Sequence, residues 1–298
     1  MAPKLGKITW IVLLFVVCVI PATVVDAQSG PPTKKDTADP VSAFERNTIS
    51  APAAVREALR LVSLRTHSTA NDGSVRNAIV IGFVGGFVKH DDLKHPEVYF
   101  ATLLRTDYPS TIHAETFANH EGKKALCRVL QLLGTNSDGV VSMSEKAQSD
   151  IIIYGHSWGA SQAVTFAREL GRRGIPVALT IQIDSVRKPS QNDSTIPPNV
   201  RNAINFYQRK GLIHGRQTIR AADPELTNII GNVEMTYRNH EINCDNYPWL
   251  ARHINRGHHE IENDPVVWNQ IGSLIDSELS KTTSLVHASL PTPPPPSN

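Results

Sequence analysis

Short apolar runs alternate with amphipathic stretches through the middle of the chain. A continuous apolar run is typical of a strand buried on both faces of a sheet. Such runs and shorter β-type segments predict strands at 77–83, 110–117, 149–154, 176–184, 203–208 and 233–237. Hydrophobic residues at helical spacing predict helices at 51–64, 95–105, 122–133, 160–170 and 264–279. Strands that alternate with helices form parallel βαβ units, so the pattern predicts an α/β fold, a three-layer sandwich with a mostly parallel central sheet.

The first residues have the pattern of a secretory signal peptide. Lys4 and Lys7 precede an apolar run at 8–20 that is too short to span a bilayer comfortably. Pro21 ends the run, and short residues before Gln28 fit a cleavage site. The sequence therefore predicts a signal peptide at 1–27, a secreted (extracellular or periplasmic) protein, and no stable membrane insertion after cleavage.

Both flanks of the predicted domain have compositions that are unsuited to a packed core. Residues 28–45 are rich in Pro, Lys, Asp and Ser, and residues 284–298 end in the run PTPPPPSN. Runs of this kind favour extended, solvated chain over packed structure. We expect disordered segments at 28–45 and 284–298, and a folded α/β domain at 46–283.

Composition narrows the classes of partner. The net charge is +2, and 40% of the 298 residues are hydrophobic, which is enough for a sizeable core. The chain has no basic block with interleaved aromatic residues, so nucleic acid is not an expected partner. Beyond the predicted signal peptide, the cysteines are Cys127 and Cys244, which either pair in an oxidising compartment or stay free thiols.

Gly155-x-Ser157-x-Gly159 joins the best predicted strand to a helix. This order matches a nucleophile elbow, in which a sharp turn presents a serine hydroxyl and small flanking residues let strand and helix approach closely. The turn also aims the N–H of Trp158 at the reacting atom. Ser157 is therefore the candidate nucleophile.

The segment 150–170 resembles the nucleophile elbow of the α/β-hydrolase superfamily, which includes esterases, lipases and thioesterases. The order of elements from about 77 to 270 is similar to that fold. The resemblance implies a serine hydrolase whose acid and histidine follow the serine in the chain, in that order. It implies neither a metal nor an organic cofactor.

Two adjacent histidines are candidates for the base that activates the serine. Residues 256–264 follow the last predicted strand and precede the last predicted helix, where a loop carrying the catalytic histidine is expected. His258 is preferred over His259 because Gly257 gives it backbone freedom. The run 258–264 also resembles the histidine loop of secreted bacterial hydrolases, in which the first position is the base.

The acid that holds the histidine has several candidates. Asp184 ends the strand that follows the nucleophile's βα unit, where active-site groups of open α/β sheets gather. Many members of the superfamily place the acid one strand later, and Asp223 lies nearer that place. Asp264 and Asp245 are weaker alternatives, so we prefer Asp184.

An oxyanion hole is expected beside the serine. Trp158 supplies one backbone N–H, and the loop after the strand at 77–83 supplies the other from Phe87 or Gly86. Together these residues predict an esterase or lipase-like enzyme that acts on small-molecule acyl esters. Thioesterase or amidase activity on the same three residues is the nearest alternative, and a non-catalytic binding protein with this fold is another.

Overall fold

The computed structural model describes residues 77–134, 149–238 and 241–288. The predicted signal peptide, the segment 28–45 and the helix at 51–64 lie outside the described residues. The last helix continues to Ala288, past the predicted domain end at 283, and the rest of the predicted tail is not described. Within the described ranges, no helix combines the length and apolarity needed to cross a membrane.

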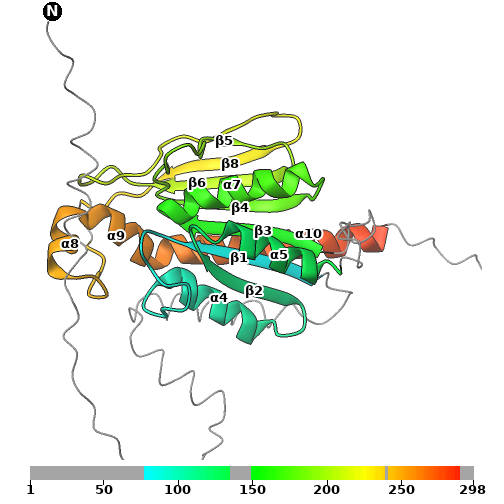
Figure 1. Cartoon of the computed structure of the whole chain (residues 1–298), viewed down its shortest axis with the longest axis horizontal. Helices are drawn as coiled ribbons and strands as arrows, with labels where there is room; N and C mark the ends of the chain where they lie inside the picture. Colours follow the sequence, from blue (N-terminus) through cyan, green and yellow to red (C-terminus); the bar gives the residue numbers. More distant parts are fainter. Residues whose placement is uncertain (1–76, 135–148, 239–240, 289–298) are drawn as a thin grey trace, which may run out of the picture. The chain divides into compact units, whose positions relative to one another are not determined.

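A parallel sheet organises the described residues (Figure 1). Its strand order is β2-β1-β3-β4-β6-β8, and every neighbouring pair is parallel. The order of the first strands reverses between β1 and β3, so the chain builds outwards in both directions from β1. The strands are β1 (Asn77–Val84), β2 (Ile112–Ala118), β3 (Ser149–His156), β4 (Val177–Ile183), β6 (Val200–Tyr207) and β8 (Asn228–Glu234). A separate two-stranded sheet pairs β5 (Thr195–Ile196) with β7 (Arg220–Ala221).

Helices cover both faces of this sheet. Ile79 and Ile81 of β1 and Ile151 of β3 pack in one buried cluster with side chains of α5 and α7. On the opposite face, Tyr154 of β3 contacts Phe100 of α4 and Trp268 of α10, with ring centroids 5.7 and 6.1 Å apart. The predicted three-layer α/β sandwich is therefore confirmed. The helices are α4 (Pro96–Asp107), α5 (Gly122–Leu132), α7 (Trp158–Arg172), α8 (Trp249–Ile254), α9 (Arg256–Asn263) and α10 (Pro265–Ala288).

Most predicted elements lie where the hydrophobic pattern places them, but the last strand does not. It was expected at 233–237, and β8 covers Asn228–Glu234 instead. Its pairing with β6 shifts register at Ala203/Ile204, whose partners are Ile229 and Gly231, so the strand carries a bulge. A half-exposed edge strand interrupted by a glycine has no continuous apolar run, which explains the error.

The segment expected to be a histidine-bearing loop is helical. Residues 256–263 form α9, and every side chain from Gly257 to Asn263 is buried. Most of these side chains are polar and are held by specific partners. Arg256 bonds Glu260 one turn away, with Nε and Oε1 3.0 Å apart. Hydrophobic periodicity cannot detect a helix that is buried through polar contacts.

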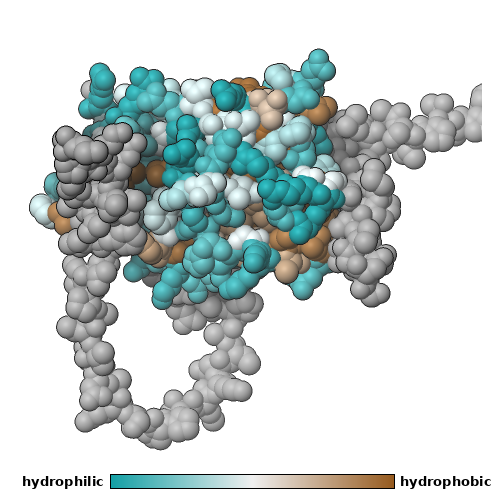
Figure 2. Space-filling model, turned by 45° about the horizontal axis from the view of Figure 1, so that its top comes forward, coloured by the Kyte–Doolittle hydropathy of each residue, from teal (hydrophilic) through white to brown (hydrophobic). Residues whose placement is uncertain are grey.

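On the face shown in Figure 2 the described surface is mostly hydrophilic, with hydrophobic residues in small patches. Exposed large apolar side chains include Phe87 and Trp249. Cys127 is exposed and Cys244 buried, and each is a free thiol, so the two do not pair.

Candidate active site

Ser157 lies at a strained turn between β3 and α7. Its backbone has φ 57° and ψ −122°, a region that non-glycine residues rarely adopt and that concentrates at functional sites. The flanking glycines are required by packing. A Cβ on Gly155 would lie 2.5 Å from the carbonyl carbon of Gly159, and one on Gly159 would lie 2.0 Å from the oxygen of Phe83. The G-x-S-x-G pattern is therefore the only one that lets β1, β3 and α7 meet this closely.

Backbone hydrogen bonds tie the turn to the end of the neighbouring strand. The N–H of Ser157 donates to the oxygen of Ile183, 3.0 Å away, and the N–H of Val186 donates to the oxygen of Ser157, 3.2 Å away. Because β3 and β4 are parallel, both strands end at the same edge of the sheet. This brings residue 184 beside the serine turn.

Asp184 and His258 form a buried pair at this edge. The Nδ1 of His258 lies 2.6 Å from the Oδ2 of Asp184. Asp184 has φ 43° and is fully buried. It also accepts hydrogen bonds from the Nε2 of Gln208, 2.8 Å away, and from the N–H of Gly215, 2.7 Å away. These donors satisfy the carboxylate and fix the position of the imidazole.

Gln208 and Gly215 were not found by sequence reasoning. Gln208 follows β6, the strand next to β4, and this adjacency was the available signal. Gly215 approaches Asp184 so closely that a Cβ would lie 2.2 Å from the carbonyl carbon of Asp184. No residue larger than glycine fits there, and a lone glycine in a long irregular segment gives no sequence signal.

The charges of the pair suit a carboxylate beside a neutral imidazole. Burial works to raise the pKa of Asp184, but hydrogen bonds from His258, Gln208 and Gly215 lower that pKa below its usual value. Burial and the nearby His156 lower the pKa of His258, against the opposite effect of Asp184. A neutral imidazole can accept a proton at neutral pH, which a general base must do.

The imidazole of His258 also lies close to the serine turn. Its ring centroid is 4.5 Å from that of His156, the residue before Ser157. Among the described residues, no hydrogen bond joins the Ser157 hydroxyl to His258. Catalytic hydrogen bonds are often long or poorly aligned without substrate and shorten in the complex. The structure thus brings His258 to Asp184 directly and to the neighbourhood of Ser157.

The predicted oxyanion residues also lie at the serine. The rings of Phe87 and Trp158 are in edge contact, with centroids 5.9 Å apart. In the loop after β1, a Cβ on Gly85 would lie 3.1 Å from the Cβ of Ser157. Gly86 has φ 38°, and its oxygen accepts a hydrogen bond from Asn119, 2.6 Å away. Within the described ranges, the N–H groups of Phe87 and Trp158 have no protein acceptor.

The alternative histidine has a different environment. His259 is buried, and its ring stacks on Tyr247 with centroids 3.7 Å apart. Neither ring nitrogen has a hydrogen-bond partner among the described residues. Burial lowers the pKa of His259 to about 3. His259 therefore lacks the carboxylate that would orient a base.

The alternative acids are engaged elsewhere. Asp223 is partly exposed and accepts the N–H of Glu225 in a turn, 3.0 Å away. Asp264 accepts the hydroxyl of Tyr237, 2.8 Å away. Asp245 is exposed and bonds Arg252. Of the four candidate acids, the structure places Asp184 on His258.

A second group of buried polar side chains lies between the start of α4 and α9. His95, Glu97 and Glu262 are buried, and one potential ligand atom from each lies within 4.8 Å of the others. Within the part of the chain that the structure describes, this is the one group with the composition and spacing to hold a metal ion. Sequence reasoning missed it because its members are far apart in the chain.

Comparisons with known proteins give only distant structural matches. No protein-family model matches the chain, and no curated protein matches its sequence. A solved structure of a putative YdeN-like hydrolase from Pectobacterium atrosepticum is 12% identical, covers 77% of this chain and 98% of its own, and has a TM-score of 0.36. An esterase from Pyrobaculum calidifontis is 12% identical, covers 82% of this chain and 99% of its own, and has a TM-score of 0.36. Another structure, a hyperthermophilic esterase from that archaeon, has a TM-score of 0.33, with 12% identity and coverage of 82% and 94%. Similarity at this level does not assign an activity.

Proposed function

We propose that this protein is a serine hydrolase that cleaves carboxylic esters through an acyl-enzyme. Ser157 is the nucleophile, His258 the general base and Asp184 the acid that orients it. The hydrogen bond of 2.6 Å between Asp184 and His258, formed beside the strained turn of Ser157, is the observation that carries the proposal. A buried carboxylate bonded to Nδ1 leaves Nε2 of the imidazole free to accept a proton.

The reaction follows from these positions. His258 takes the proton of the Ser157 hydroxyl while the oxygen attacks the ester carbonyl carbon. The N–H of Trp158, with that of Phe87 or Gly86, stabilises the negative oxygen that forms. His258 then gives its proton to the leaving alcohol. Water, activated by the same imidazole, attacks the acyl-enzyme and releases the acid.

The substrate class is a small-molecule acyl ester. Ser157 is buried, with 9% of its surface exposed. The exposed Phe87 ring against Trp158 places apolar surface beside the nucleophile. This contact favours esters whose acyl or alcohol part is at least partly apolar.

The proposal includes secretion, based on the charged and apolar pattern of residues 1–27. Expression of the full chain in its source organism, followed by N-terminal sequencing, tests it. A mature protein outside the cytoplasm that begins at Gln28 supports cleavage. An intact chain found in the cytoplasm contradicts it.

The catalytic proposal is tested with p-nitrophenyl esters of graded acyl length. Ser157→Ala is expected to lower kcat roughly 10⁴-fold or more, and His258→Ala to a similar degree. Ser273→Ala, which removes an exposed hydroxyl on α10, serves as the matched control and should leave the rate unchanged. A fluorophosphonate should label the wild type at Ser157 only. Equal rates in the wild type, Ser157→Ala and His258→Ala would refute the proposal and favour a binding protein.

Thioesters and anilides are included in the same substrate panel. A rate on anilides above that on esters would reassign the enzyme as an amidase, and a preference for thioesters would make it a thioesterase. In either case the loss in Ser157→Ala must persist, because all three reactions use the same nucleophile.

A further inference from the structure

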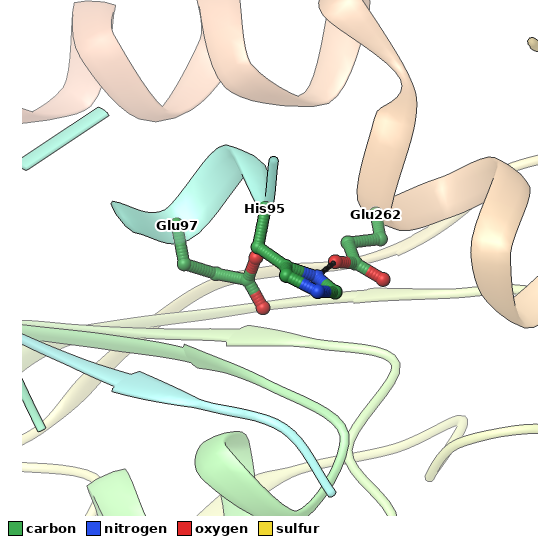
Figure 3. Close-up of side chains that lie close together, drawn as sticks. All are labelled: His95, Glu97 and Glu262. Carbon is green, nitrogen blue, oxygen red and sulfur yellow. Dashed lines mark hydrogen bonds and ion pairs between the residues drawn. The ribbon is translucent and has the colours of Figure 1, made fainter. Parts of the chain in front are cut away.

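Four buried side chains from three elements converge behind the serine turn. Figure 3 shows His95 and Glu97, at the start of α4, pointing toward Glu262 of α9. His156, the last residue of β3, completes the group. Glu97 and Glu262 are fully buried, and His156 is 3% exposed. None of these residues attacks the substrate or transfers a proton in the proposed hydrolysis.

The polar atoms lie close to one another. The Nδ1 of His95 is 2.8 Å from the Oε1 of Glu262. The Nδ1 of His156 is 3.5 Å from the Oε1 of Glu97 and 3.5 Å from the Oε2 of Glu262. Ligands of a tetrahedral ion with bonds of 2.0–2.2 Å lie roughly 3.3–3.5 Å apart. The two separations that involve His156 match this spacing, whereas His95 and Glu262, hydrogen-bonded at 2.8 Å, would have to move apart by roughly 0.5 Å to ligate one ion.

Hydrogen bonding leaves part of this group unsatisfied. Both carboxylate oxygens of Glu97 are buried without a hydrogen-bond partner among the described residues, as is the Nε2 of His156. Buried polar groups in folded proteins are almost always paired, because an unpaired one costs several kcal/mol for a charged group. Two carboxylates in one buried site attract a positive charge, which either the two histidines or a bound cation can supply.

We propose that His95, Glu97, His156 and Glu262 bind one zinc ion. Two imidazoles and two carboxylates give a nitrogen and oxygen donor set that suits Zn²⁺. Four protein ligands close the coordination sphere, so the ion is structural and leaves no position for substrate. The hydroxyl of Tyr247 donates to the Oε2 of Glu262 and would orient that ligand from outside, as outer hydrogen bonds do at metal sites.

The ion would join the elements that carry the candidate active site. α4 follows the loop of Gly86 and Phe87, β3 ends at His156 directly before Ser157, and α9 carries His258 four residues before Glu262. On a helix, residues four apart lie on the same face, so one face of α9 supplies both the base and a metal ligand. Zinc binding is therefore expected to stabilise the fold around the turn, whether or not Ser157 is catalytic.

Metal analysis of the full chain, purified without a histidine tag, tests the site. Elemental mass spectrometry should find about one zinc ion per chain in the purified wild type. After removal with a chelator, zinc at about 100 times its Kd should raise Tm by roughly 5–10 °C. X-ray absorption at the zinc edge should show nitrogen and oxygen ligands at about 2.0–2.1 Å without sulfur at about 2.3 Å.

Glu97→Gln keeps the shape of the side chain and removes one ligand charge. It should lose the stoichiometric zinc and the rise in Tm. Glu115→Gln is the matched control, because Glu115 also contacts a histidine, with its Oε2 3.1 Å from the Nε2 of His113, but lies at the surface. It should keep both the zinc and the rise in Tm.

Three outcomes would overturn the proposal. The wild type could take up no zinc and show no shift, which would leave protonated histidines as the counter-charges of the two carboxylates. Glu97→Gln could retain one zinc with the same shift, which would place the ion elsewhere. Sulfur ligands would assign it to Cys127 or Cys244. If Glu97→Gln fails to fold, the absorption spectrum of the wild type decides.

Discussion

Asp184→Asn tests the acid with little disturbance of the structure. The substitution replaces one carboxylate oxygen by an amide nitrogen and keeps the size of the side chain. Asp184 has φ 43°, a left-handed conformation that asparagine tolerates better than most residues, so the backbone need not move. The substitution changes the charge and the two hydrogen bonds of Oδ2, to His258 and to Gln208 Nε2.

The expected loss follows from the hydrogen bonds at this position. The N–H groups of Gly215 and Gln208 donate to Oδ1 of Asp184, whereas Gln208 Nε2 and His258 Nδ1 both contact Oδ2. When the asparagine oxygen keeps the two backbone donors, its amide nitrogen takes the place of Oδ2, faces Nδ1 of His258 and loses the hydrogen bond from Gln208 Nε2. An amide donor at Nδ1 forces the imidazole proton onto Nε2, which then cannot accept the proton of Ser157. In serine proteases, the Asp-to-Asn substitution at the same place holds the histidine in the wrong tautomer and lowers kcat about 10⁴-fold. The same fall, about 5 kcal/mol in activation free energy, is expected here.

The assay is hydrolysis of p-nitrophenyl butyrate at saturating substrate. Asp223→Asn is the matched control, because Asp223 is the rival acid and lies in a partly exposed turn. It should keep the wild-type kcat, while thermal unfolding confirms that both variants are folded. A folded Asp184→Asn with wild-type kcat, or an Asp223→Asn that loses as much activity, would refute the assignment of the acid.

Other positions give independent predictions. Gly159→Ala should lower the free energy of unfolding by roughly 3 kcal/mol or more, since its Cβ would lie 2.0 Å from the oxygen of Phe83; an unchanged urea midpoint would contradict this packing. His259→Phe should keep kcat/KM near the wild-type value and not lower Tm, because it preserves the stack on Tyr247 and removes two unpartnered nitrogens; a loss like that of His258→Ala would make His259 the base. Burial raises the pKa of Asp276 from 3.8 to about 6, against the hydrogen bond from Tyr108, so the folded state favours the protonated acid and loses stability as pH rises from about 4 to about 6. Asp276→Asn should thus gain about 1 kcal/mol at pH 8, after allowance for partial exposure, and almost nothing at pH 4; denaturant curves with equal gains at both pH values would contradict this.

The sheet and the position of the serine turn were accessible from the sequence because they depend on local pattern. β3 is a continuous apolar run, and glycine is the only residue type that fits at positions 155 and 159 beside Ser157. Chain order then led to Asp184 and His258, which the structure places in contact. Their roles in catalysis, like the oxyanion donors, remain predictions that the assays above address.

The parts that could not be predicted depend on contacts between distant polar residues. α9 was expected to be a loop because its buried side chains are histidines and glutamates, whose burial is favourable only with their partners in place. The partners of Glu262 are His95 and Tyr247, one of them 167 residues away in the chain. β8 was misplaced for a related reason, since its position depends on a bulge opposite β6.

His156 connects the two buried polar groups. Side chains alternate along a strand, so His156 points to the same face of β3 as Tyr154, the face covered by α4 and α10. There its Nδ1 meets Glu97 and Glu262, while its ring lies 4.5 Å from that of His258. Any positive charge held by the carboxylates, whether a proton on His156 or a metal ion, therefore lies next to the base and disfavours a second charge on it. His156, the residue before Ser157 in the G-x-S-x-G turn, thus helps to keep His258 neutral through the contact between their two rings.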